Sequence, residues 1–96
     1  MQTVELEIRN PSGLHARPAA LFVKTAAGFR SKILVENVTR GTAPANAKSI
    51  LTLLAGGVSK GHLVRISVEG DDEEEAISAL RSLVERGIGE PLGPET

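Results

Sequence analysis

Hydrophobic and polar residues alternate at the start of this chain. Over residues 3–8 every second side chain is apolar, which is the period of a strand with one buried face. The same alternation predicts strands over residues 31–37 and 63–69. A brief strand follows the turn at residues 39–42, and Pro44 restricts it to a sheet edge because proline cannot donate a ladder hydrogen bond.

Apolar positions spaced three or four residues apart predict helices between these strands. The first helix spans about residues 16–27 and stops at Gly28. The second spans about residues 47–54, with Asn46 as its N-cap and Gly56 near its end.

A third helix is predicted after the last strand. Asp71 and Asp72 open it, and Glu74 or Glu75 lies at the spacing of a capping box. Gly87 ends the helix.

The order of these elements predicts an α+β fold. We expect a two-layer open-faced sandwich, in which a four-stranded antiparallel sheet is covered on one face by three helices in the order βαββαβα. One domain is expected over residues 1–87, because 96 residues support a single core. Residues 88–96 are rich in glycine and proline, so we expect a flexible tail without packed structure.

Composition removes several classes of function. The chain has no cysteine, which excludes disulfide scaffolds, thiolate metal sites and thiol chemistry. Its 11 basic and 12 acidic residues, without tryptophan or tyrosine, argue against a nucleic-acid binder. No apolar run is long enough for a membrane span, and Met1-Gln2 leads directly into a strand, so a cytoplasmic location is expected. His62 is read as an isolated surface histidine, and no metal site or cofactor is expected.

Residues 13–19, Gly-Leu-His-Ala-Arg-Pro-Ala, have the features of an anion site at the start of a helix. Gly13 frees the backbone, His15 is placed to cap the helix, and Pro18 fixes φ within the first turn. Arg17 offers a planar fork for phosphoryl oxygens. The first turn contains no acid, so the positive end of the helix dipole stays unneutralised.

This arrangement suits phosphoryl transfer. The neutral imidazole of His15 is a usable nucleophile, and the amide hydrogens of Ala16 and Arg17 point toward a phosphate on its ring. The guanidinium of Arg17 adds charge-assisted hydrogen bonds where negative charge accumulates. A simpler alternative is that His15 only caps the helix and Arg17 is a solvated charge; the complete heptapeptide favours the chemical role.

With the heptapeptide, with Asn-Ala-Lys-Ser-Ile at residues 46–50 and with this element order, residues 3–86 resemble the HPr family, the histidine phosphocarriers of the bacterial phosphoenolpyruvate-dependent phosphotransferase system. The resemblance implies that His15 takes a phosphoryl group from enzyme I. It then passes the group to the A domain of a sugar-specific enzyme II. The protein would thus be a monomeric carrier rather than an enzyme.

Ser49 is a second candidate site, because it falls in the first predicted turn of the second helix. The resemblance implies phosphorylation of this serine by an HPr kinase/phosphorylase and recognition by a catabolite-control regulator. The alternative is a serine without a regulatory role, since serine is common in first turns.

The resemblance also implies a docking surface on the first two helices. Its expected apolar members are too many for a small core to bury, and basic residues ring them. These residues are Ala20, Lys24, Lys48, Ile50, Leu51 and Leu54.

Three classes of function stay open at this point. The first is the carrier, which could also serve nitrogen-related phosphotransfer or dihydroxyacetone kinase chains. The second is a regulatory module that acts through phospho-Ser49. The third is an unrelated interaction domain of the same fold.

Overall fold

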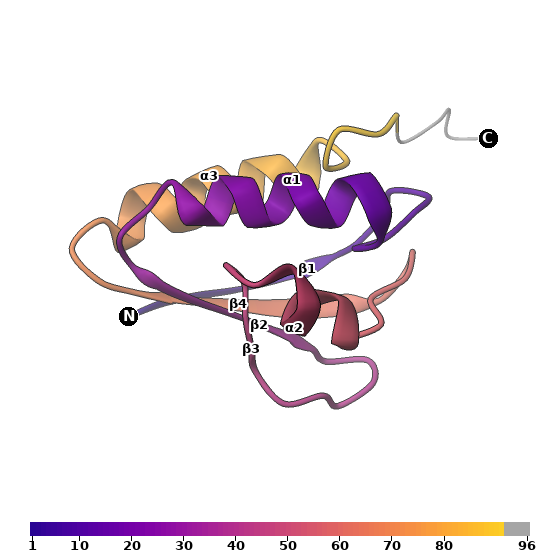
Figure 1. Ribbon diagram of the computed structural model, residues 1–96, viewed down its shortest axis with the longest axis horizontal. Coiled ribbons are helices and arrows are strands. Elements are labelled where there is room, and N and C mark those ends of the chain that lie inside the picture. Colours follow the sequence, from indigo (N-terminus) through magenta and orange to yellow (C-terminus); the bar gives the residue numbers. More distant parts are fainter. Residues whose placement is uncertain (92–96) are drawn as a thin grey trace.

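The computed structural model describes residues 1–91, which form three helices packed on one face of a four-stranded antiparallel sheet (Figure 1). The strands lie in the order β1-β4-β2-β3, which confirms the predicted fold class. In chain order the elements are β1 (Gln2–Glu7), α1 (Ala16–Ala27), β2 (Lys32–Asn37), β3 (Ala45–Asn46), α2 (Ile50–Ala55), β4 (Leu63–Glu69) and α3 (Glu73–Glu85).

Strand β4 is central and supplies one row of the core. Val64, Ile66 and Val68 are buried on its inner face, as the alternation predicts, and β1 and β2 flank it. Strand β3 pairs only with β2 and is therefore an edge strand, which confirms the position inferred from Pro44.

Helix α1 has the predicted bounds and lies beside α3 above the sheet (Figure 1). Its face toward the sheet buries Ala19, Phe22 and Ala26 completely. Leu21 and Val23 are only partly buried at its margins.

Helix α2 begins later than predicted. It starts at Ile50, and its N-cap is Ser49 instead of Asn46. Asn46 belongs to β3, where it pairs with Leu34. Its side chain accepts a hydrogen bond from the Lys48 amide at 2.9 Å. Residues 46–49, which the local sequence assigns to the start of the helix, therefore belong to β3 and to the turn before α2.

The predicted capping box of α3 is wrong. Asp72 occupies the N-cap position but makes no side-chain capping bond. Its carboxylate instead accepts hydrogen bonds from the Arg30 amide at 2.8 Å and from the Ser31 amide at 3.0 Å, and the Ser31 hydroxyl also donates to it. Asp72 therefore joins the start of α3 to the segment between α1 and β2.

This contact predicts a pH-dependent loss of stability. Hydrogen bonds, first from the Ser31 hydroxyl and next from the Arg30 amide, lower the pKa of Asp72 to about 2. The unfolded chain therefore binds the proton first as pH falls, so the stabilisation is complete above about pH 4 and is lost toward about pH 2. Denaturant unfolding should show wild type and Asp72→Ala converging in unfolding free energy over that interval. A difference that is constant from about pH 5 to about pH 2 would contradict this role.

The chain packs beyond the predicted domain boundary at residue 87. Ile88 is buried in the core, and the Glu90 carboxylate is hydrogen-bonded to Asn10 and Ser12. The expectation of an unpacked tail is therefore wrong for Ile88 and Glu90. Residues 92–96, the remainder of that predicted tail, lie outside the described residues.

Candidate functional site

His15 stands directly before α1, at the end of a well-fixed loop. Its backbone is extended, with φ −122° and ψ 160°, and its residue is half-buried. The preceding Leu14 is fully buried, and its amide donates to the Val58 carbonyl at 3.0 Å. The imidazole makes no capping hydrogen bond, contrary to the sequence expectation, so the ring is not engaged by its own helix.

Gly13 is required by the close approach of another loop. Its φ is +59°, and a Cβ atom at this position would lie 2.4 Å from the Val58 carbonyl oxygen. Backbone atoms cannot move aside as a flexible side chain can. Because glycine has no Cβ atom, the loop that carries His15 can pack against Val58 and Ser59.

Ala16 adopts a left-handed conformation with φ +50°, although it is the first residue of α1. Such a conformation costs a non-glycine residue on the order of 1–3 kcal/mol and persists when surrounding contacts determine it. The sequence offers no sign of this feature, because alanine is an ordinary helix residue.

The start of α1 is open to an anion. Within an α-helix the amides of the first turn have no acceptor, which applies here to Ala16 and Arg17. The first turn contains no acidic residue, and both residues are exposed. The structure thus places the predicted phosphate-binding groups next to His15, where oxyanions would meet amide donors and a guanidinium.

Glu90 is a component of this region that the sequence analysis missed. Its pKa is lowered, first by the hydrogen bond from the Asn10 side chain and then by those from Ser12; the positive charge of Arg17 acts in the same direction. Because the segment is rich in glycine and proline, nothing local indicates that an acid there returns to the loop before His15.

Ser49 lies at the N-cap of α2, one residue before the helix instead of within its first turn. It is half-buried, and its hydroxyl oxygen accepts from the Thr52 amide at 3.4 Å. The hydroxyl is therefore at the boundary between β3 and the exposed face of α2.

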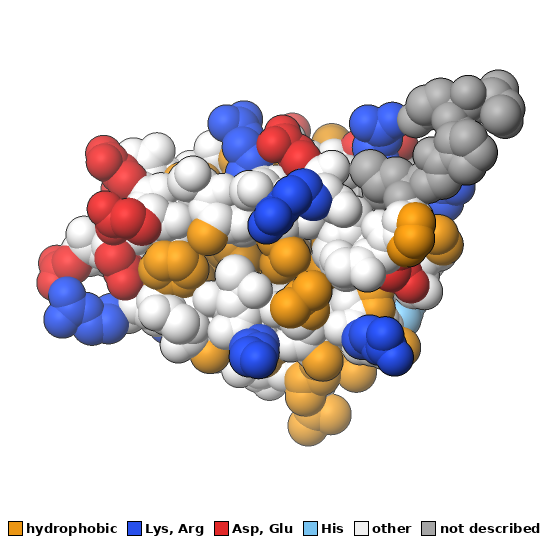
Figure 2. Space-filling model, turned by 90° about the horizontal axis from the view of Figure 1, so that it is seen from above, with side chains coloured by type: hydrophobic (Ala, Val, Ile, Leu, Met, Phe, Trp, Pro, Cys, Tyr) orange, Lys and Arg blue, Asp and Glu red, His pale blue; other side chains and the backbone are white. Residues whose placement is uncertain are grey.

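The predicted docking residues form a partly apolar exposed surface. Leu51 is 77% exposed, Ile50 38% and Leu54 37%, while Leu53 is buried in the core. Ala20 and Lys24 are also exposed. Figure 2 shows Lys and Arg side chains among hydrophobic ones on the helical face, with a group of acidic side chains at the left-hand end.

Lys48 differs from the freely exposed rim residue that was expected. Its ammonium donates to the Phe29 carbonyl oxygen at 2.6 Å and its side chain is partly buried. Lys48 therefore joins the segment before α2 to the residues that follow α1.

His62 is more constrained than a surface histidine. Its Nδ1 accepts from the Ser59 amide at 3.1 Å and lies 3.1 Å from the Asn37 side-chain nitrogen. This ring is thereby held in the loop that follows α2, and no anion-binding helix start adjoins it.

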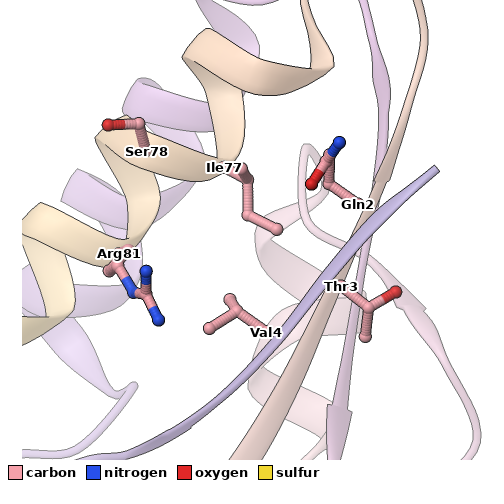
Figure 3. A pocket seen from close by; sticks show the side chains of 6 residues that line it. All are labelled: Gln2, Thr3, Val4, Ile77, Ser78 and Arg81. Atoms are coloured by element: carbon pink, nitrogen blue, oxygen red, sulfur yellow. The ribbon is translucent and has the colours of Figure 1, made fainter.

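A separate hollow of about 200 Å³ lies between β1 and α3 (Figure 3). It contains none of the predicted site residues. It is lined by Gln2, Thr3, Val4, Ile77, Ser78 and Arg81. Among residues 1–91 there is no group of three His, Asp or Glu residues that could hold a metal ion, and no helix there is long and apolar enough to span a membrane.

Comparisons with known proteins point to one family. A family described as "PTS HPr component phosphorylation site" matches residues 2–86. The phosphocarrier protein HPr of Mycoplasma pneumoniae is 33% identical, covering 90% of this chain and 96% of its own length. A crystal structure of HPr from Thermoanaerobacter tengcongensis is 54% identical with a TM-score of 0.88, covering 94% of this chain and 98% of that one.

The chain is also similar to part of a longer protein. The multiphosphoryl transfer protein of Salmonella typhimurium is 40% identical over 88 residues, which are 92% of this chain. This chain spans only 23% of that relative's length.

Proposed function

This chain belongs to the HPr family of phosphocarriers of the phosphotransferase system, and from that premise we propose that His15 accepts a phosphoryl group from enzyme I and passes it to the A domain of a sugar-specific enzyme II. One observation carries the proposal. His15 stands directly before α1, where first-turn amides such as those of Ala16 and Arg17 have no acceptor within a helix and where the first turn holds no acid.

The transfer exchanges one bond to phosphorus for another. A ring nitrogen of neutral His15 donates its lone pair to phosphorus while the bond to the donor group breaks, and the ring proton stays on the other nitrogen. The N–P bond is labile, so a second protein can collect the group by the same exchange. The carrier therefore supplies a nucleophile and a place for the phosphoryl oxygens.

Arg17 and Ala16 hold those oxygens in this proposal. The exposed guanidinium of Arg17 is able to donate two parallel charge-assisted hydrogen bonds, and the amides add fixed donors. Charge develops on the same oxygens during transfer, so donors already in place stabilise it without reorganisation.

Protein partners are proposed to dock on the exposed part of α1 and α2. Ala20, Ile50, Leu51 and Leu54 supply apolar area, and Lys24 supplies positive charge beside it. An acidic partner surface is complementary to this pattern. We further propose that the carrier acts as a monomer in the cytoplasm. The domain would work either as a separate protein or as part of a longer one. Nitrogen-related phosphotransfer chains and dihydroxyacetone kinase chains are alternatives to sugar transport.

The test is phosphorylation with purified enzyme I and phosphoenolpyruvate, read by intact mass. One added phosphoryl group on the chain, and its transfer to an enzyme II A domain, would support the carrier. A mass that does not change with active enzyme I, while a known HPr is labelled in the same mixture, would refute it.

Regulation through Ser49 is a second proposal, favoured by its place at the border of the exposed α2 face. An HPr kinase/phosphorylase would add the phosphate, and a catabolite-control regulator would recognise it. The added charge of about −1.5 to −2 would lie next to the surface where an acidic partner docks.

Ser49→Asp should therefore slow phosphorylation of His15 by enzyme I, by roughly three- to tenfold at low protein concentration, because association weakens. The reaction rate is measured against the concentration of this protein. Ser78→Asp, which adds the same charge on α3, is the matched control and should react as wild type. A lowered plateau with unchanged half-saturation would contradict the docking explanation.

A further inference from the structure

We propose that Glu90 is a positioning residue of the phosphocarrier site, because its carboxylate holds the loop that presents His15. This inference rests on the proposed function of His15. We name the contacts of Glu90 with Asn10 and Ser12 the clasp. Its three hydrogen bonds join residues 78 and 80 positions apart in the chain.

Each oxygen of the Glu90 carboxylate is used in the clasp. Oε1 accepts from the Asn10 side-chain nitrogen at 2.9 Å and from the Ser12 amide at 3.0 Å. Oε2 accepts from the Ser12 hydroxyl at 2.8 Å. An acceptor with two oxygens in one plane thus fixes both the backbone and the side chain of Ser12.

The clasp continues into the loop without a flexible break. Asn10 is fully buried and also donates from its side chain to the Gly13 carbonyl at 2.9 Å, while the Gly13 amide donates to the Asn10 carbonyl at 3.2 Å. The next residue, Leu14, is bonded to Val58. The loop is therefore held by Glu90 at one end and by Val58 at the other, and His15 follows directly.

The segment that carries Glu90 is itself fixed by packing. Ile88 is 1% exposed and has a φ of +50°, which a β-branched residue adopts only when its surroundings determine it. Gly87 and Gly89 are also left-handed, with φ +91° and +79°, so the chain turns sharply after α3. Figure 1 shows this turn returning toward the start of α1. The segment before Glu90 is thus held in place by packing, and it fixes the position of the Glu90 side chain beside the loop.

The test separates hydrogen bonding from charge. Glu90→Ala removes all three contacts, whereas Glu90→Gln keeps a carbonyl oxygen for Asn10 and the Ser12 amide and an amide group for the Ser12 hydroxyl. With enzyme I and phosphoenolpyruvate, we expect Glu90→Ala to lower the maximal rate of His15 phosphorylation about tenfold with a KM within about twofold of wild type. Glu90→Gln should stay within about twofold of wild type in both constants.

A second measurement reads the loop itself. Hydrogen exchange of the Ser12 amide, followed by NMR in the unphosphorylated protein, should accelerate about tenfold or more in Glu90→Ala and little in Glu90→Gln. Glu85→Ala is the matched control, because it removes an exposed acid of the same charge from α3; it should leave both readouts unchanged.

Several results would overturn the proposal. The first is a wild-type maximal rate in Glu90→Ala, or a rise in its KM without a loss of maximal rate. The second is an equal loss of maximal rate in Glu90→Ala and Glu90→Gln. The third is an unchanged exchange rate of the Ser12 amide in Glu90→Ala. A wild-type protein that accepts no phosphoryl group refutes the carrier function instead. The clasp is then judged by exchange alone, which supports it if Ser12 exchanges faster in Glu90→Ala and refutes it otherwise.

Discussion

His15→Ala is expected to abolish phosphoryl labelling by enzyme I and phosphoenolpyruvate. Of the two histidines in the chain, His15 is the one beside the start of a helix and the Arg17 guanidinium. Removing its ring removes the nucleophile, so no residual transfer to this site is expected. Intact mass should show one phosphoryl group on wild type, lost in acid and kept in base, and none on the variant.

The matched control is His62→Ala. It should keep the label, because His62 serves structurally through its bonds with Ser59 and Asn37. Circular dichroism would confirm that both variants are folded at the assay temperature. Labelling of His15→Ala under the same conditions, with the same acid lability, would place the phosphoryl group elsewhere and refute the assignment.

Gly13→Ala is expected to have the largest effect on stability among single methyl additions in the loop. The new Cβ would meet the Val58 carbonyl oxygen at 2.4 Å and the Ser59 Cα at 2.8 Å, while the backbone stays at φ +59°. Left-handed strain and overlap together predict a loss of roughly 3 kcal/mol in unfolding free energy. Relief of the overlap would move the loop away from Val58, so His15 phosphorylation should slow as well.

Gly41→Ala separates the two causes of that loss. Gly41 has a similar φ of +67°, but no atom beyond Gly41 and its two chain neighbours lies within 4 Å of the position of its added Cβ. Only the cost of the left-handed backbone conformation remains, so Gly41→Ala should lose about 1 kcal/mol in unfolding free energy. Urea unfolding of the two variants measures the difference, and equal losses would show that the approach of Val58 does not matter.

Elements with strong local periodicity could be predicted from the sequence. Residues 16–27 and 63–69 match α1 and β4, because the apolar spacing of each is the spacing that its environment in the core requires. The start of α2 could not be predicted in this way. Asn46 is a good N-cap locally, yet its pairing with Leu34 on β2, distant in the chain, takes it into the sheet.

In the candidate site, too, residues marked by a local pattern could be predicted from the sequence, and residues that depend on distant contacts could not. His15 and Arg17 lie within one heptapeptide whose residue types indicate their chemistry, so the sequence identifies them. The left-handed Ala16 and the contact of Lys48 with Phe29 depend on surroundings set by the whole fold. Glu90 meets its partners across most of the chain and has no local pattern at all.

The turn after α3 also determines how this domain would be joined to others. Glu90 brings the chain to the loop before His15, whereas Met1 lies at the other end of the molecule with its amine 3.1 Å from the Glu73 carboxylate (Figure 1). The C-terminal side of the domain, at Glu90, therefore lies beside the loop that carries His15, the proposed phosphoryl acceptor, and the N-terminal side lies far from it. Affinity tags and fluorescent fusions should accordingly be less intrusive for phosphotransfer at Met1, and a fused neighbour on the C-terminal side would have short access to the phosphoryl group.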